Sequence, residues 1–131
     1  MKLFLFIVLI SATVAGCKKD DIGPANLVGT WELRHYSGTI AGVSKDVPPG
    51  SGKLIQFNAD STFKRFTDFK QDAQGKFRIV KGGISWGDAK YDGIFFDDRE
   101  PGDFIILKND SLTIGNTFPD GVTSLYIKQN K

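Results

Sequence analysis

Apolar and polar residues alternate most clearly in residues 27–36, which read LVGTWELRHY. Successive side chains of a β-strand point to opposite faces of its sheet, so this period predicts a strand with one buried face. The positions expected on the buried face are Leu27, Gly29, Trp31, Leu33 and His35. Those expected on the other face are Thr30, Glu32, Arg34 and Tyr36.

The chain beyond this strand continues as short segments separated by turn residues. The sequence holds 15 Gly and five Pro, and no window after residue 25 keeps a helical period of apolar residues, so helices are not expected. Residues 37–52 contain Pro48-Pro49-Gly50 and no clear strand, which predicts a long loop of the kind that often carries function. The further expected strands are 53–57, 62–69, 75–81, 84–86, 91–96, 104–108, 111–114 and 122–129.

Turn chemistry sets the expected pairing of these strands. Residues 58–61, Gly82-Gly83, Asn109-Asp110 and residues 119–121 are turn-forming and predict reversals of the chain. The hairpin around residues 58–61 would direct Phe57, Phe63 and Phe69 into a core and Phe66 to the opposite face.

Eight or nine short antiparallel strands within residues 26–131 predict one all-β domain. Closure of a meander into a β-barrel removes exposed strand edges, and we favour it for that reason. A β-sandwich would produce nearly the same pattern and remains the alternative.

The first sixteen residues have the features of a signal peptide. Met1-Lys2 precedes an apolar run at residues 3–10 and small or weakly polar residues up to Gly16. The apolar run is shorter than the roughly 18 residues expected of a spanning helix, so cleavage is favoured over a permanent anchor.

Val14-Ala15-Gly16-Cys17 resembles a bacterial lipobox, in which the Cys is acylated before cleavage. An ordinary secretory peptide would leave the single Cys of this chain unexplained. The resemblance implies lipid attachment at Cys17, with acyl chains joining the protein to a membrane. Residues 17–25 then form a flexible tether. Lys19-Asp20-Asp21 also resembles the signal that carries some lipoproteins to the cell surface, so the expected location is the outer membrane, surface-exposed or facing the periplasm.

The composition excludes several function classes. A net charge of +2 with interspersed signs gives no basic stripe for nucleic acid. One Cys and one His rule out the multi-Cys and paired-His metal motifs, and no nucleophile is paired with a base in the sequence. We therefore expect no catalytic residue, metal or cofactor, and no enzyme.

Three further features could carry other chemistry. Four carboxylates crowd into one turn and could serve a small hydrolase or Ca²⁺, although a solvated turn is favoured: Asp97, Asp98, Glu100 and Asp103. His35 is expected as a hydrogen-bonded or rim residue. Trp86 is expected to be buried, which would exclude it as a stacking platform.

Leu27 to Leu33, with its Gly29-x-Trp31 pattern, resembles the first strand of lipocalins. Residues 54–63, 104–114 and 125–128 resemble strands of the lipocalin-like domains on bacterial lipoproteins. The resemblance implies a meander barrel that Gly29 and Trp31 close at one end, with Lys128 as the basic partner of Trp31. Six aromatic residues are then the candidates to line either a ligand cavity or a filled core: Trp31, Phe57, Phe63, Phe77, Phe95 and Tyr126.

The expected function is that of a lipid-anchored, lipocalin-like binding or accessory module of the outer membrane whose ligand is small and apolar. The contact region would be the barrel mouth and residues 37–52. The alternative is a structural or protein-interaction module of the cell envelope with a filled barrel and no ligand.

Overall fold

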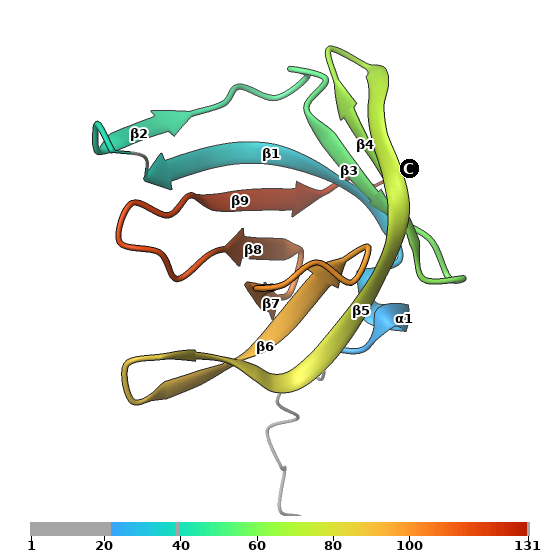
Figure 1. Cartoon of the computed structure of the whole chain (residues 1–131). Coiled ribbons are helices and arrows are strands. Elements are labelled where there is room, and N and C mark those ends of the chain that lie inside the picture. Colours follow the sequence, from blue (N-terminus) through green and yellow to red (C-terminus); the bar gives the residue numbers. More distant parts are fainter. Residues whose placement is uncertain (1–21, 39, 131) are drawn as a thin grey trace, which may run out of the picture.

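The computed structural model describes residues 22–38 and 40–130 (Figure 1). Cys17, the signal peptide and most of the expected tether lie outside the described residues. The elements are α1 (Pro24–Leu27), β1 (Gly29–Gly38), β2 (Val43–Asp46), β3 (Leu54–Phe57), β4 (Thr62–Thr67), β5 (Lys70–Trp86), β6 (Ala89–Phe96), β7 (Asp103–Lys108), β8 (Ser111–Gly115) and β9 (Thr123–Lys128).

The strands form a closed antiparallel barrel. From β3 to β9 each strand pairs with the next, β1 pairs with β3, and the β1–β9 pairing closes the sheet. The result is a barrel of eight strands with β2 as an extra strand beside β1. The predicted antiparallel barrel is therefore confirmed, and the sandwich alternative is wrong. Because the closing pairs join residues 31–37 to residues 123–128, the chain from Ile22 onward contains a complete barrel with its own core.

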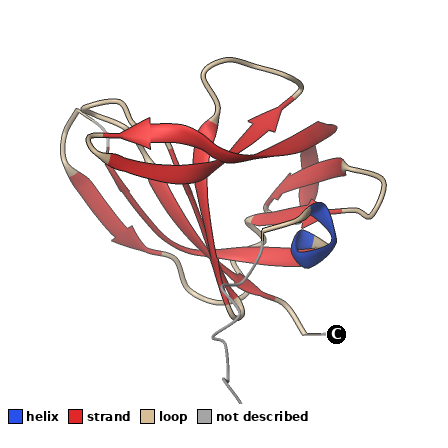
Figure 2. Ribbon diagram, turned by 90° about the horizontal axis from the view of Figure 1, so that it is seen from below, coloured by secondary structure: helices blue, strands red, loops and turns tan. Residues whose placement is uncertain are grey.

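The helix α1 lies at one end of the barrel (Figure 2), and its Leu27 belongs to the same core cluster as Trp31. The Trp31 side chain is fully buried, and its Nε1–H donates a 2.8 Å hydrogen bond to the Leu27 carbonyl. The Lys128 Nζ lies 5.3 Å from the Trp31 ring centroid. Gly29 has φ +138°, and a Cβ there would meet the Lys128 Cε at 3.0 Å, so this position suits glycine.

The folded part begins earlier than the sequence predicts. Ile22 is only 6% exposed and belongs to the core, and Pro24–Leu27 form a short helix where none was expected. Residues 22–25 are therefore not part of a flexible tether, and Leu27 packs from the helix and not from the first strand. The Pro at the helix start has a φ that suits this position.

The prediction of a strandless loop over residues 37–52 is also wrong. β2 lies within that range and pairs with β1, with His35 opposite Asp46 and Gly38 opposite Val43. All four residues of β2 are exposed, so the strand has no alternation of apolar residues that would reveal it.

The predicted turn at Gly82-Gly83 is an irregularity inside β5. That strand runs 17 residues, and its pairing with β6 shifts between Val80 and Ile84. The chain reverses instead after Trp86, where Gly87 has φ +58°. Phe69 is not a core residue as predicted, because it lies at the β4–β5 turn and its side chain is 65% exposed.

A second register shift changes the direction of His35. Leu33 lies opposite Tyr126, but His35 lies opposite Leu125, so an extra residue of β1 separates the two pairs. Residues directly opposite in an antiparallel pair point to the same face. His35 therefore lies on the outer face with Leu125, and the prediction that it shares the Trp31 face is wrong.

Candidate functional site

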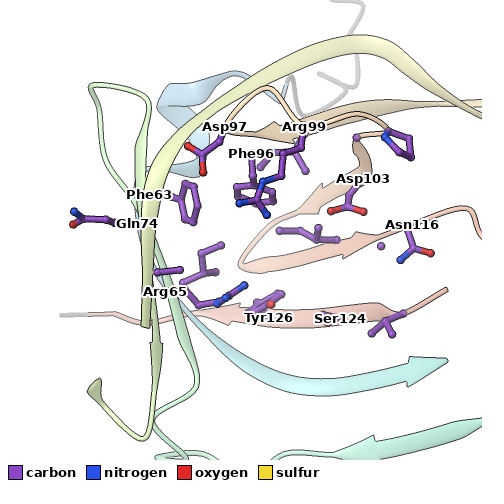
Figure 3. Close-up of a pocket in the computed structure, with 18 residues that line it drawn as sticks. Phe63, Arg65, Gln74, Phe96, Asp97, Arg99, Asp103, Asn116, Ser124 and Tyr126 are labelled. Carbon is purple, nitrogen blue, oxygen red and sulfur yellow. The ribbon is translucent and has the colours of Figure 1, made fainter. Parts of the chain in front are cut away.

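A cavity of about 510 Å³ lies at the barrel end opposite Trp31. Strand β9 runs from one end to the other. Its Ser124 and Tyr126 line the cavity, and its last residue, Lys128, lies over the Trp31 ring. The chain between β6 and β7 and the residues that follow β8 complete the rim (Figure 3). Cavities of this size hold small-molecule ligands in other proteins.

The cavity is apolar on part of its wall and polar elsewhere. The large apolar side chains that line it are Ile55, Phe63, Ile94, Phe96, Ile114 and Val122. The polar and charged ones are Arg65, Gln74, Asp97, Arg99, Asp103, Asn116, Ser124 and Tyr126. An amphipathic ligand suits this division better than a wholly apolar one.

The six aromatic residues predicted to line the interior lie in three different places. Phe63 and Tyr126 line the cavity. Trp31, Phe57 and Phe77 pack in the core outside its lining.

The sixth aromatic residue, Phe95, faces away from the cavity. Phe95 lies opposite Arg78 and packs with Ile84 and Phe104 in a separate cluster, whereas the neighbouring Phe96 lies opposite Phe77 and lines the cavity. The prediction for Phe95 as a cavity residue is wrong, and Phe96 was missed. Both are Phe, so the sequence offers no signal for which of the two points inward.

Several hydrogen-bond acceptors around the cavity are already used by the protein. The Asp97 carboxylate accepts the Lys76 backbone N–H at 2.8 Å. The Asn116 side-chain oxygen accepts the Phe118 N–H at 3.3 Å. Gln71 donates to the side-chain oxygen of Gln74 at 2.9 Å. The amide NH₂ group of Asn116 thus remains for other contacts, whereas the Gln74 side chain points away from the cavity (Figure 3).

Two arginines line the cavity and differ in their pairing. Arg65 Nε lies 3.1 Å from an Asp72 carboxylate oxygen, which leaves the terminal nitrogens of Arg65 for other contacts. The Arg99 side chain has no hydrogen bond or ion pair with any residue in the described ranges 22–38 and 40–130. Arg65, Arg99 and Asp103 lie around the same space (Figure 3).

Burial raises the pKa of the Asp103 carboxyl above its ordinary value. It also raises the pKa of the Tyr126 hydroxyl, although a hydrogen bond with Ser124 and the positive charge of Arg65 oppose that rise. The negative charge of Asp103 adds to it. Tyr126 is therefore a neutral hydroxyl near one cation and one carboxyl.

The acidic turn does not gather its four carboxylates at one place. Asp98 and Glu100 both pair with Arg78, at 2.6 Å and 3.3 Å, while Asp97 and Asp103 line the cavity. Within the described ranges, no group of three or more His, Cys, Asp or Glu residues could hold a metal ion.

The extra strand creates a hydrogen-bonded series that the sequence analysis missed. His35 Nδ1 lies 2.7 Å from an Asp46 carboxylate oxygen, and the Ser44 hydroxyl lies 3.3 Å from His35 Nε2. This order resembles a Ser-His-Asp triad. The Asp46 side chain, however, is 95% exposed, so water competes for these bonds, and we regard the series as a surface link between β1 and β2.

Trp86 is not buried as predicted. Its side chain is 51% exposed, and its ring centroid lies 5.5 Å from that of Phe104. The residue extends the outer cluster of Ile84, Phe95 and Phe104 and does not line the cavity.

Comparison with protein-family models, with curated proteins and with solved structures finds no match to this chain. Among the described residues, no helix has the length and apolar content to cross a membrane.

Proposed function

We propose that this chain is a lipid-anchored, lipocalin-like binding protein of the bacterial outer membrane that holds one small molecule in its barrel. The observation that carries the binding function is the cavity of about 510 Å³ at the end of the barrel opposite Trp31. It falls within the roughly 300–1,000 Å³ of ordinary ligand pockets. The lipobox-like residues before Cys17 support the anchor.

The division of the cavity wall indicates how the ligand would lie. Phe63, Phe96 and Ile94 offer apolar contact area, which favours a hydrocarbon or ring portion of the ligand. The charged side chains would face the polar portion. This arrangement supports a ligand-binding role over a structural module with a filled barrel, since a filled barrel would leave no space for either portion.

Native mass spectrometry of residues 18–131 tests the binding function. We expect the purified domain, incubated with an extract of its host's membranes, to carry a mass adduct that delipidation removes. Ala73→Trp places a large ring in the cavity wall and should abolish the adduct. Ala89→Trp makes the same change on an exposed strand position outside the cavity and should keep it. A clean apo mass in every sample would contradict the binding function.

A further inference from the structure

Resting on that proposed function, we infer that the ligand is an amphipathic organic anion whose acidic headgroup is bound by Arg65 and Arg99. The two arginines come from different parts of the chain, one from β4 and one from the β6–β7 connection, and both line the same cavity. They lie around one space together with Asp103 and Tyr126 (Figure 3).

The first argument is the excess of hydrogen-bond donors over acceptors. One carboxylate oxygen of Asp97 and the side-chain oxygen of Asn116 accept hydrogen bonds within the protein. The donors around the cavity are the Arg99 guanidinium, the terminal nitrogens of Arg65, the Asn116 NH₂ group and the hydroxyls of Ser124 and Tyr126, which share one hydrogen bond; the carboxylates are those of Asp97 and Asp103. A ligand that satisfies these donors must itself be rich in acceptor oxygens, as a carboxylate or sulfate is.

The second argument is the state of the arginines. A guanidinium stays charged and presents its N–H donors in a planar fork that matches an oxyanion. The third arginine near this rim, Arg78, is already paired with Asp98 and Glu100 on the outer side, and its guanidinium lies over the Phe95 ring. Arg99 has no such partner within the described part of the chain, so its fork is available to a ligand.

Two carboxylates, Asp97 and Asp103, line the cavity with the two arginines and would favour a cationic headgroup if their negative charge dominated. One Asp97 oxygen already accepts the Lys76 backbone N–H, whereas the Arg99 guanidinium has no partner in the described part of the chain. The burial of Asp103 also favours its protonated form, in which it donates to an anion instead of repelling it. Besides its acidic headgroup, the ligand could carry a hydroxyl or N–H that donates a hydrogen bond to an Asp103 oxygen.

Isothermal titration with three ten-carbon probes tests the inference: decanoate, decanol and decylamine. The protein is the mature chain with Cys17→Ser, so that no acyl chain competes for the cavity. We expect decanoate to bind about tenfold more tightly than either other probe, as charge-assisted hydrogen bonds of about 1.5–3 kcal/mol would give.

Arginine variants identify the headgroup site. Arg99→Gln and Arg65→Gln should each weaken decanoate binding by about tenfold and change decanol binding by less than about twofold. Arg78→Gln removes the same charge from the neighbouring outer surface and should leave both affinities unchanged. A melting curve of each variant establishes that it is folded.

The outcomes separate the two proposals. If decanol or decylamine binds as tightly as decanoate, or if Arg78→Gln weakens decanoate as much as Arg99→Gln does, the anion inference is wrong and the binding function stands. If the folded wild-type chain binds none of the three probes, the anion inference is wrong, and the native mass spectra decide separately whether the binding function stands.

Discussion

The single residue Lys128 links the last strand to the closed end of the barrel. Its Nζ lies 5.3 Å from the Trp31 ring centroid, and its stem covers Gly29. Lys128→Gln keeps part of the stem and removes the charge, so we expect the free energy of unfolding to fall by about 0.5–2 kcal/mol. Lys108→Gln, at an exposed position of β7, is the matched control and should change it by less than about 0.5 kcal/mol. Urea denaturation measures both, and equal losses would contradict the cation–π contact.

Asp103 predicts a pH dependence of stability. Burial raises the pKa of this carboxyl in the folded state, so folding opposes its ionisation. Its contribution to the free energy of unfolding therefore falls as the pH rises from the ordinary pKa of the unfolded chain to the raised pKa of the folded one. The facing charged or titratable groups are Arg65, Arg99, Asp97 and Tyr126. Asp103→Asn should therefore raise the melting temperature at pH 7 and leave it nearly unchanged at pH 3, where both forms are neutral. Calorimetry at the two pH values measures this, and a lower melting temperature at pH 7 would contradict it.

The sequence predicted the direction of a side chain correctly where adjacent residues differ in polarity or size. Trp31 and Tyr126 alternate with polar or smaller residues, and the predicted inward direction of both agrees with their burial or cavity contacts. Phe95 and Phe96 are adjacent and identical in type, so only the register with β5 decides which one faces inward. That register depends on a shift between Val80 and Ile84, which no local pattern encodes.

Among the elements, hairpins were predictable and irregularities were not. The turns at residues 58–61 and at Asn109-Asp110 were predicted from residue type, and both connect paired strands in the structure. Gly82-Gly83 has the same type of sequence but lies within a continuous strand, where Asp92 accepts the Gly82 N–H at 3.0 Å. The long-range partner, absent from any local window, decides between turn and bulge.

The connection between β2 and β3 is held to β1 by a buried carboxylate. Glu32 is 3% exposed, accepts the Gly50 N–H at 2.6 Å and pairs with Arg34 at 3.0 Å. Glu32→Ala removes the acceptor of both bonds, and water can reach Gly50 and part of the Arg34 side chain, so we expect a loss of about 1.5–3 kcal/mol in the free energy of unfolding. Glu32→Gln retains an acceptor for Gly50 and should lose less.

Hydrogen–deuterium exchange locates this effect. In Glu32→Ala the amides of residues 47–53 should exchange faster, while those of the β7–β8 hairpin should keep the relative protection of the wild type. Uniformly faster exchange across the barrel would contradict a local role for Glu32 in holding the connection.

At the scale of the whole molecule, the sequence predicted the barrel but not its cavity. Closure follows from many short strands with turn residues between them. Whether the interior is filled depends on how side chains such as Phe63, Phe96 and Tyr126 pack once the barrel is closed. That packing joins residues from different strands, so no local stretch of sequence determines it. The residue types alone fit a filled core and a lined cavity equally well.

The direction of the cavity relative to the membrane follows from where the folded chain begins. Ile22 and α1 pack with Trp31 at the closed end, whereas the cavity lies at the other end. Ile22 lies five positions after Cys17, and so short a segment spans at most about 17 Å when fully extended. Lipidation of Cys17 would therefore hold the closed end near the bilayer and direct the cavity away from it.

Fluorescence transfer to an acceptor dye on the lipid headgroups tests this orientation. Cys17 is the only cysteine, and acylation blocks its thiol, so a dye can be attached at a single introduced cysteine. Ala59→Cys places the dye on the turn after β3 at the closed end, and Asp120→Cys places it beyond β8 at the cavity end. In liposomes carrying the full lipidated chain, transfer from position 59 should exceed transfer from position 120. Equal transfer would mean that the barrel tumbles freely on its anchor, and the reverse order would mean that the cavity faces the lipid; either result contradicts the orientation argued from Ile22.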